Sequence, residues 1–256
     1  MFKKLNIFTS KEHRPEAPQR PLPVLTDIHA HLVPGIDDGA RDICHGADLA
    51  QELERLGIRR LVLTPHVTDE VFPNTPSTID PPLALLRNEL RERGSRLDIH
   101  VSAEYRIDEL LYAQLRQGLV RPMPGGYLLI ECGWMSEPFR LEAFVTELVR
   151  HYGYRPILAH PERYPYYQRE PGQYRRLRRM GLRFQINILS LAGFYGTQVR
   201  ELAKEMMEKN MVEFIGTDLH NHRHLDSITR YLNSREYAHL ERYSSRLLND
   251  KVFADA

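Results

Sequence analysis

The sequence has few of the features that mark secreted and membrane proteins. Cys44 and Cys132 are its two cysteines, too few for a disulfide framework and suited to a reducing compartment. No apolar run approaches the roughly 18 residues of a membrane-spanning helix. The first residues lack the apolar core and the small-residue cleavage site of a secretory signal. These absences predict a cytoplasmic protein with no membrane span.

The sequence also lacks an excess of charge of one sign. Its 35 basic and 34 acidic residues leave a formal net charge of +1, which argues against non-specific binding of nucleic acid. Neither a break in composition nor a repeat of fixed period divides the 256 residues. We therefore expect one domain over residues 24–256, preceded by a polar, proline-rich and flexible leader over residues 1–23.

Short apolar runs alternate with longer stretches of helical periodicity. The runs predict strands at about residues 24–31, 60–64, 98–103, 127–130, 156–159, 183–188 and 213–216. The longer stretches predict helices at about 41–56, 81–93, 108–117, 137–151, 172–180 and 197–209, with one or two more from Leu225. Seven strand–helix units in succession predict an α/β protein with a parallel sheet, as a (β/α) barrel or an open doubly wound sheet.

The first predicted strand ends in a His-x-His pair. His29 and His31 are two residues apart, so on a strand both imidazoles point to the same side. Two carboxylates, Asp37 and Asp38, follow in a loop bounded by glycines. Imidazole is a common metal ligand, and a carboxylate adds the negative charge that a divalent cation needs. The pair indicates a metal site, although two unrelated histidines would give the same local pattern.

Residues that bind metals also follow five other predicted strands. In a β/α barrel, the carboxyl ends of all strands open on one face, where active sites form. Four carboxylates gathered there would repel one another by several kcal/mol unless cations were present. We therefore expect two or three divalent cations at that face. The candidate ligands are His29, His31, Asp38, His66, Glu104, Glu131, His160, Asp218 and His220.

The order of these motifs resembles that of the PHP (polymerase and histidinol phosphatase) superfamily. The motifs are Asp27-Ile-His-Ala-His31, Asp37-Asp-Gly39, Thr64-Pro-His66, Ala103-Glu-Tyr105, Leu129-Ile-Glu131, Leu158-Ala-His-Pro-Glu-Arg163 and Thr217-Asp-Leu-His220. The segments 33–40 and 159–164 are most similar to the bacterial PHP-type protein-tyrosine phosphatases of capsule and exopolysaccharide biosynthesis. The resemblance implies a distorted (β/α)7 TIM-like barrel. It also implies that the nine candidate residues bind up to three metals at the carboxyl ends of the strands, usually Mn²⁺, with iron or zinc also possible.

The resemblance further implies a metal-dependent phosphomonoesterase that hydrolyses phosphotyrosine by direct attack of metal-bound hydroxide. The implied partner is a phosphotyrosine protein, namely the C-terminal tail of a bacterial tyrosine kinase of polysaccharide export. Arg163 is expected to bind phosphate through its planar fork. Arg223 is a candidate by its proximity to His220, and His222 is a candidate leaving-group acid or part of a basic rim.

Other functions remain open. A small-molecule phosphatase, such as a histidinol-phosphate phosphatase, would use the same metal site, because loops set the specificity. A PHP-type nuclease is disfavoured by the near-neutral charge, and a metal-holding scaffold by the presence of all nine ligand types. A cysteine phosphatase is disfavoured because neither cysteine begins a Cys-x5-Arg loop. The sequence carries no prediction of the oligomeric state.

Overall fold

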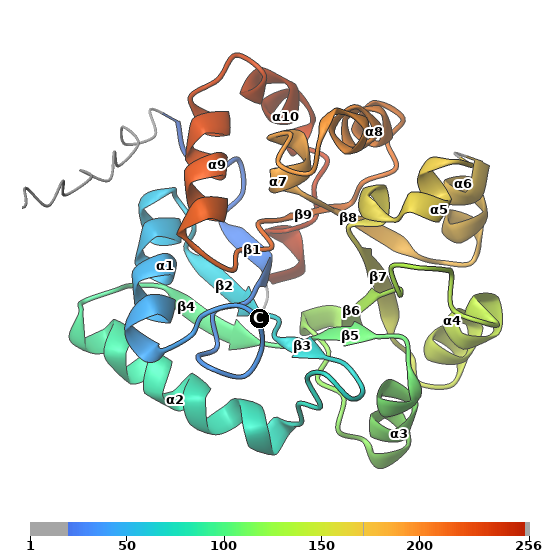
Figure 1. The fold of residues 1–256 in the computed structure, drawn as a ribbon, viewed down its shortest axis with the longest axis horizontal. Helices are drawn as coiled ribbons and strands as arrows, with labels where there is room; N and C mark the ends of the chain where they lie inside the picture. Colours follow the sequence, from blue (N-terminus) through green and yellow to red (C-terminus); the bar gives the residue numbers. More distant parts are fainter. Residues whose placement is uncertain (1–19, 171, 254–256) are drawn as a thin grey trace, which may run out of the picture.

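The computed structural model describes residues 20–170 and 172–253 (Figure 1). Most of the predicted leader, residues 1–19, lies outside them. Strands gather in the centre of the molecule and helices surround them (Figure 1). The strands are β1 (Thr26–Ala30), β2 (Arg60–Leu63), β3 (His66–Val67), β4 (Asp98–Val101), β5 (Glu104–Arg106), β6 (Tyr127–Glu131), β7 (Arg155–Ala159), β8 (Arg183–Asn187) and β9 (Phe214–Gly216).

The helices lie between these strands and after the last one. The α-helices are α1 (Ile43–Arg55), α2 (Pro76–Glu92), α3 (Glu109–Gln117), α4 (Leu141–Arg150), α5 (Pro165–Gln168), α6 (Gly172–Arg179), α7 (Ile188–Leu191), α8 (Thr197–Glu208), α9 (His222–Leu232) and α10 (Tyr237–Ser244). Short 3-10 turns are η1 (Pro124–Gly126), η2 (Pro161–Arg163) and η3 (Lys251–Phe253). No helix in the described part of the chain combines the length and hydropathy that a membrane crossing requires.

The strands form two parallel sheets, with the orders β1-β2-β4 and β3-β5-β6-β7-β8-β9. The predicted α/β class with a parallel sheet is confirmed, and the six-stranded sheet makes a half-barrel. The second and third predicted strands are each followed by a separate short strand, which the sequence reading missed. Pro65 separates β2 from β3 because it has no N–H for a ladder, while Ser102 and Ala103 separate β4 from β5.

Helix α2 begins five residues before its predicted start at residue 81. The prediction placed the prolines of this region at the first helical turn, but Pro81 and Pro82 lie inside the helix. The helix begins instead at a capping box, in which the Thr75 and Thr78 side chains satisfy backbone N–H groups. The capping box, and not the position of the prolines, therefore sets the residue at which α2 begins.

Strands β1 and β9 meet at the edges of the two sheets. Ala30 and Leu219 form a parallel bridge, the Asp218 N–H donates to His29 O at 2.8 Å, and the His31 N–H donates to Leu219 O at 3.0 Å. These bonds place residues near the two ends of the chain next to one another. Three of the candidate ligands, His29, His31 and Asp218, take part in this seam.

Buried Asn249 also joins β1 to β9, four residues before the Ala30–Leu219 bridge in each segment of the chain. Its Nδ2 donates to Thr26 O at 3.0 Å and to Ile215 O at 2.8 Å, and its Oδ1 accepts from the Ile215 N–H at 3.1 Å. At the other end of the chain, Leu22 is buried and its N–H donates to Leu56 O at 2.7 Å. The first described segment is thus bonded to the end of α1, and the last is bonded to β1 and β9.

We expect Asn249→Ala to destabilise the fold, because it leaves buried backbone groups of β1 and β9 without partners. The expected loss in the free energy of unfolding is about 2–4 kcal/mol, measured by urea denaturation. Asn88→Ala, on the exposed face of α2, is the matched control and should change stability by less than about 0.5 kcal/mol. Equal effects of the two substitutions would contradict the role given to Asn249.

Candidate metal centre

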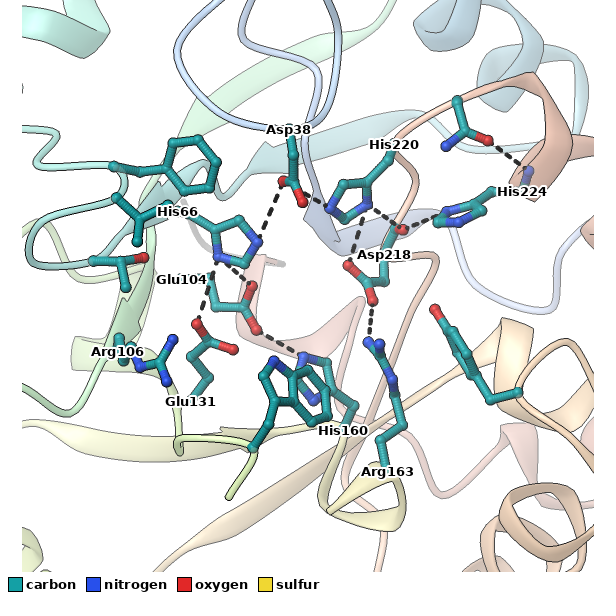
Figure 2. Close-up of a pocket in the computed structure, with 16 residues that line it drawn as sticks. Asp38, His66, Glu104, Arg106, Glu131, His160, Arg163, Asp218, His220 and His224 are labelled. Carbon is teal, nitrogen blue, oxygen red and sulfur yellow. Dashed lines mark hydrogen bonds and ion pairs between the residues drawn. The ribbon is translucent and has the colours of Figure 1, made fainter. Parts of the chain in front are cut away.

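A pocket of about 440 Å³ opens at the carboxyl ends of the strands (Figure 2). Seven of the nine candidate ligands line it, and His29 and His31 lie fully buried against the others. The structure therefore brings all nine residues together, from β1, β3, β5, β6 and the loops that follow β1, β7 and β9. The seven are Asp38, His66, Glu104, Glu131, His160, Asp218 and His220.

The two histidines of β1 point their Nε2 atoms at one another, 3.1 Å apart. Glu104 Oε2 lies 3.2 Å from His29 Nε2 and 3.4 Å from His31 Nε2. Asp218 Oδ1 lies 3.4 Å from each of the same two nitrogens. Two imidazoles and two carboxylates thus converge on one small volume.

The other ring nitrogens of these histidines have acceptors as partners. His29 Nδ1 donates to Gln185 Oε1 at 2.8 Å, and His31 Nδ1 donates to Asp37 Oδ2 at 3.0 Å. When Nδ1 carries the proton of a neutral imidazole, Nε2 presents a lone pair. Such outer hydrogen bonds orient metal-binding histidines in proteins. The two Nε2 atoms are therefore set up to bind a cation.

Glu104 Oε2 tests whether the donor set fits a metal. This buried oxygen has no hydrogen-bond partner among residues 20–170 and 172–253, although His29 Nε2, His31 Nε2 and His66 Nδ1 all lie within 3.2–3.4 Å of it. Lone pairs that face one another in a buried place, without protons between them, are costly. A divalent cation shared by these atoms removes the cost, so the residues fit a metal.

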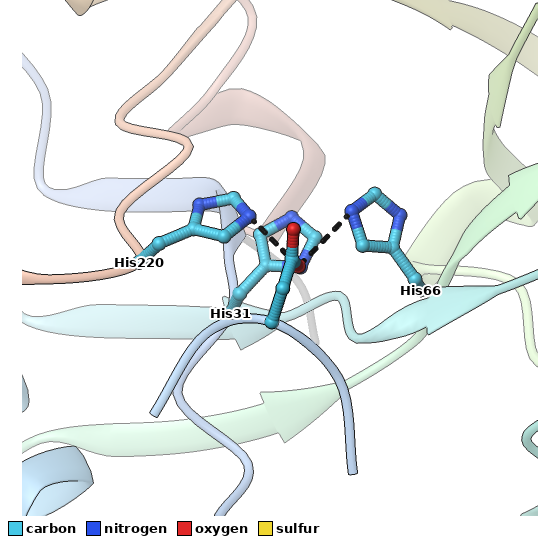
Figure 3. A group of neighbouring side chains, drawn as sticks. His31, His66 and His220 are labelled. Carbon is cyan, nitrogen blue, oxygen red and sulfur yellow. Dashed lines mark ion pairs between the residues drawn. The ribbon is translucent and has the colours of Figure 1, made fainter. Parts of the chain in front are cut away.

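A second part of the centre lies nearer the mouth of the pocket. Asp38 Oδ1 lies 3.4 Å from His220 Nε2 and 3.6 Å from His66 Nε2 (Figure 2), and Figure 3 shows the same two histidines beside His31. With His31, these residues form one of four overlapping groups whose ligand atoms lie within 4.8 Å of one another. The other groups are His29, His31 and Glu104; His29, His160 and Asp218; and His66, Glu104 and Glu131.

Burial and neighbouring groups shift the pKa values of the side chains in the centre in opposite directions. Burial, followed by the charge of Glu104, raises the pKa of Glu131 well above its usual range. A hydrogen bond from His220 lowers the pKa of Asp38 to about 2. Burial lowers the pKa of His66 to about 4, which keeps this imidazole in the neutral form that binds metals.

The two adjacent aspartates of the first loop have different tasks. Asp37 Oδ2 accepts from His31 Nδ1 and from the His66 N–H at 3.1 Å, and its Oδ1 accepts from the Gly39 N–H at 3.0 Å. Asp38 instead points into the pocket. A Cβ on Gly39 would lie 2.0 Å from His31 O, so this loop can close over β1 only with glycine there.

Arg163 reaches the pocket from η2, directly after β7. Its Nη1 donates to Asp218 Oδ2 at 2.9 Å. The centre of its guanidinium lies 4.7 Å from the ring centroid of Trp134 and 4.0 Å from that of Tyr195. The stacking fixes the plane of the guanidinium and leaves its remaining N–H groups free to face an anion.

The comparisons with known proteins agree with this geometry. The family described as "Capsular polysaccharide synthesis, CpsB/CapC" matches residues 25–237. The chain belongs to this family. Among curated relatives, the chain is similar to the tyrosine-protein phosphatase YwqE of Bacillus subtilis, with 31% identity over 77% of this chain and 78% of the relative. It is also similar to the putative tyrosine-protein phosphatase CapC of Staphylococcus aureus, with 28% identity over 89% of this chain and 90% of the relative.

A solved structure shares the fold of this CpsB/CapC family member. It comes from work described as crystal structures of YwqE from Bacillus subtilis and CpsB from Streptococcus pneumoniae, "unique metal-dependent tyrosine phosphatases". The TM-score is 0.72 at 28% identity, covering 87% of this chain and 94% of the other. The family resemblance read from the sequence motifs is therefore confirmed.

Two predicted site residues do not line the pocket. His222 and Arg223 are exposed in the first turn of α9. The Arg223 guanidinium lies over the Phe194 ring at 5.3 Å, and the His222 ring lies 5.3 Å from that of His45. The next residue, His224, lines the pocket instead. The helix start decides this, because Asn221 caps α9 and successive side chains on a helix then point in directions about 100° apart.

Several residues of the site were missed from the sequence. Two of them, Arg106 and Asn187, lie two residues after another site residue on the same strand, which is the spacing that identified the histidine pair. Arg106 follows Glu104 on β5, and Asn187 follows Gln185 on β8, so each pair shares one face of its strand. Asn187 Nδ2 donates to Asp218 Oδ2 at 2.6 Å. Strand periodicity would have found these residues, but nothing local in the sequence identifies Tyr195, which comes from the loop before α8.

Glu162, between the candidate ligand His160 and Arg163, gives a pH-dependent prediction. Its Oε1 accepts from Ser190 Oγ at 2.6 Å and from the Asn187 N–H at 2.9 Å, whereas no described residue bonds to its Oε2. Burial raises the pKa of this carboxyl from 4.5 to about 7. The folded state therefore holds a proton that the unfolded chain has already released.

The unfolding free energy of the metal-free protein should consequently fall as the pH rises between those two pKa values. The expected contribution of Glu162 is up to about 3 kcal/mol. Glu162→Gln stays neutral, so its stability relative to the wild type should increase from about pH 5 to about pH 8. Urea denaturation at several pH values measures the difference, and parallel pH profiles of the two proteins would refute the assignment.

Proposed function

We propose that this chain is a metal-dependent protein-tyrosine phosphatase. One observation carries the proposal: nine histidine and carboxylate side chains converge at a pocket that also holds an arginine between aromatic rings. The relatives named tyrosine-protein phosphatases belong to the same family and cover most of the chain. Phosphate-monoester hydrolysis is very slow without a catalyst. Clustered cations and a fixed guanidinium would accelerate it by activating water and neutralising the charge of the phosphoryl group.

In this proposal the ligands of two or three divalent cations are the nine residues predicted from the sequence. Manganese is the first candidate, and iron or zinc would also suit histidine and carboxylate ligands. Bound cations supply Lewis acidity, which activates water as a nucleophile and neutralises phosphoryl charge. Gln185 and Asp37 hold His29 and His31 in the tautomers that ligation requires.

The protein side chains around the centre position the substrate. Arg163 binds the phosphoryl oxygens with the N–H groups that Asp218 does not use, and Asp218 holds the guanidinium in place. Trp134 and Phe72 line the pocket with apolar rings, which suit the phenyl ring of phosphotyrosine. Arg223 and His222 have no part in this arrangement, since they lie outside the pocket.

The proposed substrate is a phosphotyrosine protein, with a bacterial tyrosine kinase of polysaccharide export as the physiological candidate. The apolar rings of Trp134 and Phe72 favour the uncharged phenyl ring of phosphotyrosine over histidinol phosphate, which carries a polar imidazole and an ammonium group. A substrate panel tests the choice, since a higher kcat/KM for histidinol phosphate than for phosphotyrosine peptides would overturn it.

We also propose that the seven strand regions form one distorted (β/α)7 barrel. The bridge between Ala30 and Leu219 supports this arrangement, because it joins β1 of one sheet to the chain directly after β9 of the other. On the opposite side, the chain passes from β2 to β3 and from β4 to β5 within a few residues. Convergence of ligands from six strand regions also follows from such closure.

His29→Ala should abolish hydrolysis of p-nitrophenyl phosphate and lower the bound metal, while the chain stays folded. His29 is fully buried among the proposed ligands, so its loss removes one lone pair from the centre. Elemental analysis, circular dichroism and turnover with added Mn²⁺ measure the three effects. His151→Ala, at the exposed end of α4, is the matched control and should retain metal and turnover. Unchanged metal content in His29→Ala would contradict the ligand role.

Arg163→Ala should impair substrate handling more than metal content. Losing a charged hydrogen bond to phosphate is expected to lower kcat/KM by about 10- to 100-fold. Elemental analysis should show nearly full metal content, because Asp218 keeps its other partners. Arg169→Ala, exposed beside the same loop, serves as the control. Loss of metal in proportion to turnover would assign Arg163 a structural role instead.

A further inference from the structure

A second arginine, Arg106, lies in the same pocket and has no assigned task. It follows Glu104 by two residues on β5, so both side chains point to the same face of the strand. Arg106 is partly exposed and lines the pocket, whereas Glu104 is fully buried. The strand that supplies a central candidate ligand therefore also presents a guanidinium at the substrate side.

The two pocket arginines differ in their partners. Arg163 is bonded to Asp218 and stacks on two rings. Within residues 20–170 and 172–253, the Arg106 side chain has no hydrogen bond, and no carboxylate oxygen lies within 4.0 Å of its nitrogens. Glu131 acts on the Arg106 charge only at longer range, so the guanidinium N–H groups remain open to an anion of the substrate.

The backbone makes room for this guanidinium. A Cβ on Gly133 would lie 3.2 Å from Arg106 Nη2, so the absence of a side chain at this position lets Arg106 lie where it does. Figure 2 places Arg106 and Arg163 on two sides of Glu131 and His160. A phosphoryl group held at Arg163 beside Asp218 thus leaves Arg106 facing another part of the substrate.

We infer that Arg106 is a specificity-determining residue that binds an anionic side chain next to the phosphotyrosine. The anion is a carboxylate or a second phosphate, since a guanidinium fork recognises both. The inference rests on the proposed phosphatase function and names the substrate class, namely phosphotyrosine peptides with an acidic or phosphorylated neighbour. In this inference Arg163 binds the reacting phosphoryl group and Arg106 binds the neighbouring anion.

The test compares kcat/KM for matched phosphotyrosine peptides with the manganese-loaded enzyme. One pair carries glutamate or glutamine beside the phosphotyrosine, and a second pair carries phosphotyrosine or tyrosine there. We expect the wild type to prefer the anionic member of at least one pair by about fivefold, and the pair that shows the preference identifies the source of the anion. In Arg106→Gln this ratio should fall towards one.

The matched control is Arg116→Gln, which removes the same charge from an exposed site on α3 outside the pocket and should keep the preference. Gly133→Ala, which crowds the Arg106 guanidinium without removing its charge, should lower the ratio in part. This second variant also tests the inference if Arg106→Gln folds poorly, as judged by circular dichroism and metal content.

Three results would overturn the inference. The first is a wild type without preference in either pair, and the second is a preference that survives in Arg106→Gln. The third is an equal fall for all peptides and for p-nitrophenyl phosphate, which would place the reacting phosphoryl group at Arg106. A wild type that hydrolyses p-nitrophenyl phosphate but no phosphotyrosine peptide would overturn the proposed function, and the inference with it.

Discussion

The structure depends on a gathering of acceptor atoms that repel one another unless a cation lies between them. In the part of the chain that the structure describes, Glu104 Oε2 has no hydrogen-bond partner and faces three imidazole nitrogens at 3.2–3.4 Å. Burial makes this arrangement expensive in the protein alone. Metal binding and stability are therefore linked at this centre, because the cations bind the folded arrangement and not the unfolded chain.

The residues behind the centre keep these acceptors from relaxing apart. Gln185 and Asp37 fix the rings of His29 and His31, while Asn187 fixes Asp218. Gln185 and Asn187 lie on β8 and Asp37 lies in the loop after β1, so the geometry is held from two sides. Such outer contacts decide whether ligands stay within the small tolerance that a metal site allows.

The two arginines of the pocket, Arg163 and Arg106, differ in how firmly they are held. Arg163 is tied to a candidate ligand and stacked between rings, which suits a group that must hold one orientation through the reaction. Arg106 has no hydrogen bond to another described side chain, feels the charge of Glu131 only at longer range, and lies beside Gly133, which gives it room. A fixed cation favours the transition state, whereas a freer one contributes selectivity between substrates.

The sequence by itself determined the α/β class, the seven strand regions and the nine candidate ligands, but not the short strands β3 and β5. These features follow from local rules, namely the period of two along a strand and the single face at which parallel strands end. The sequence did not determine which side chains after His220 reach the pocket. His222, Arg223 and His224 differ by one helical step each, and the cap at Asn221 selects His224.

The tertiary structure alone decided the contacts between distant segments. Tyr195 reaches Arg163 from the loop before α8, and Asn249 closes the seam between β1 and β9. The break of β2 into β3 and of β4 into β5 sets the depth at which His66 and Glu104 face the pocket. These contacts depend on how closely the edges of the two sheets approach one another and on where each loop crosses the ends of the strands. Neither quantity is encoded in a short window, because both result from packing across the whole chain.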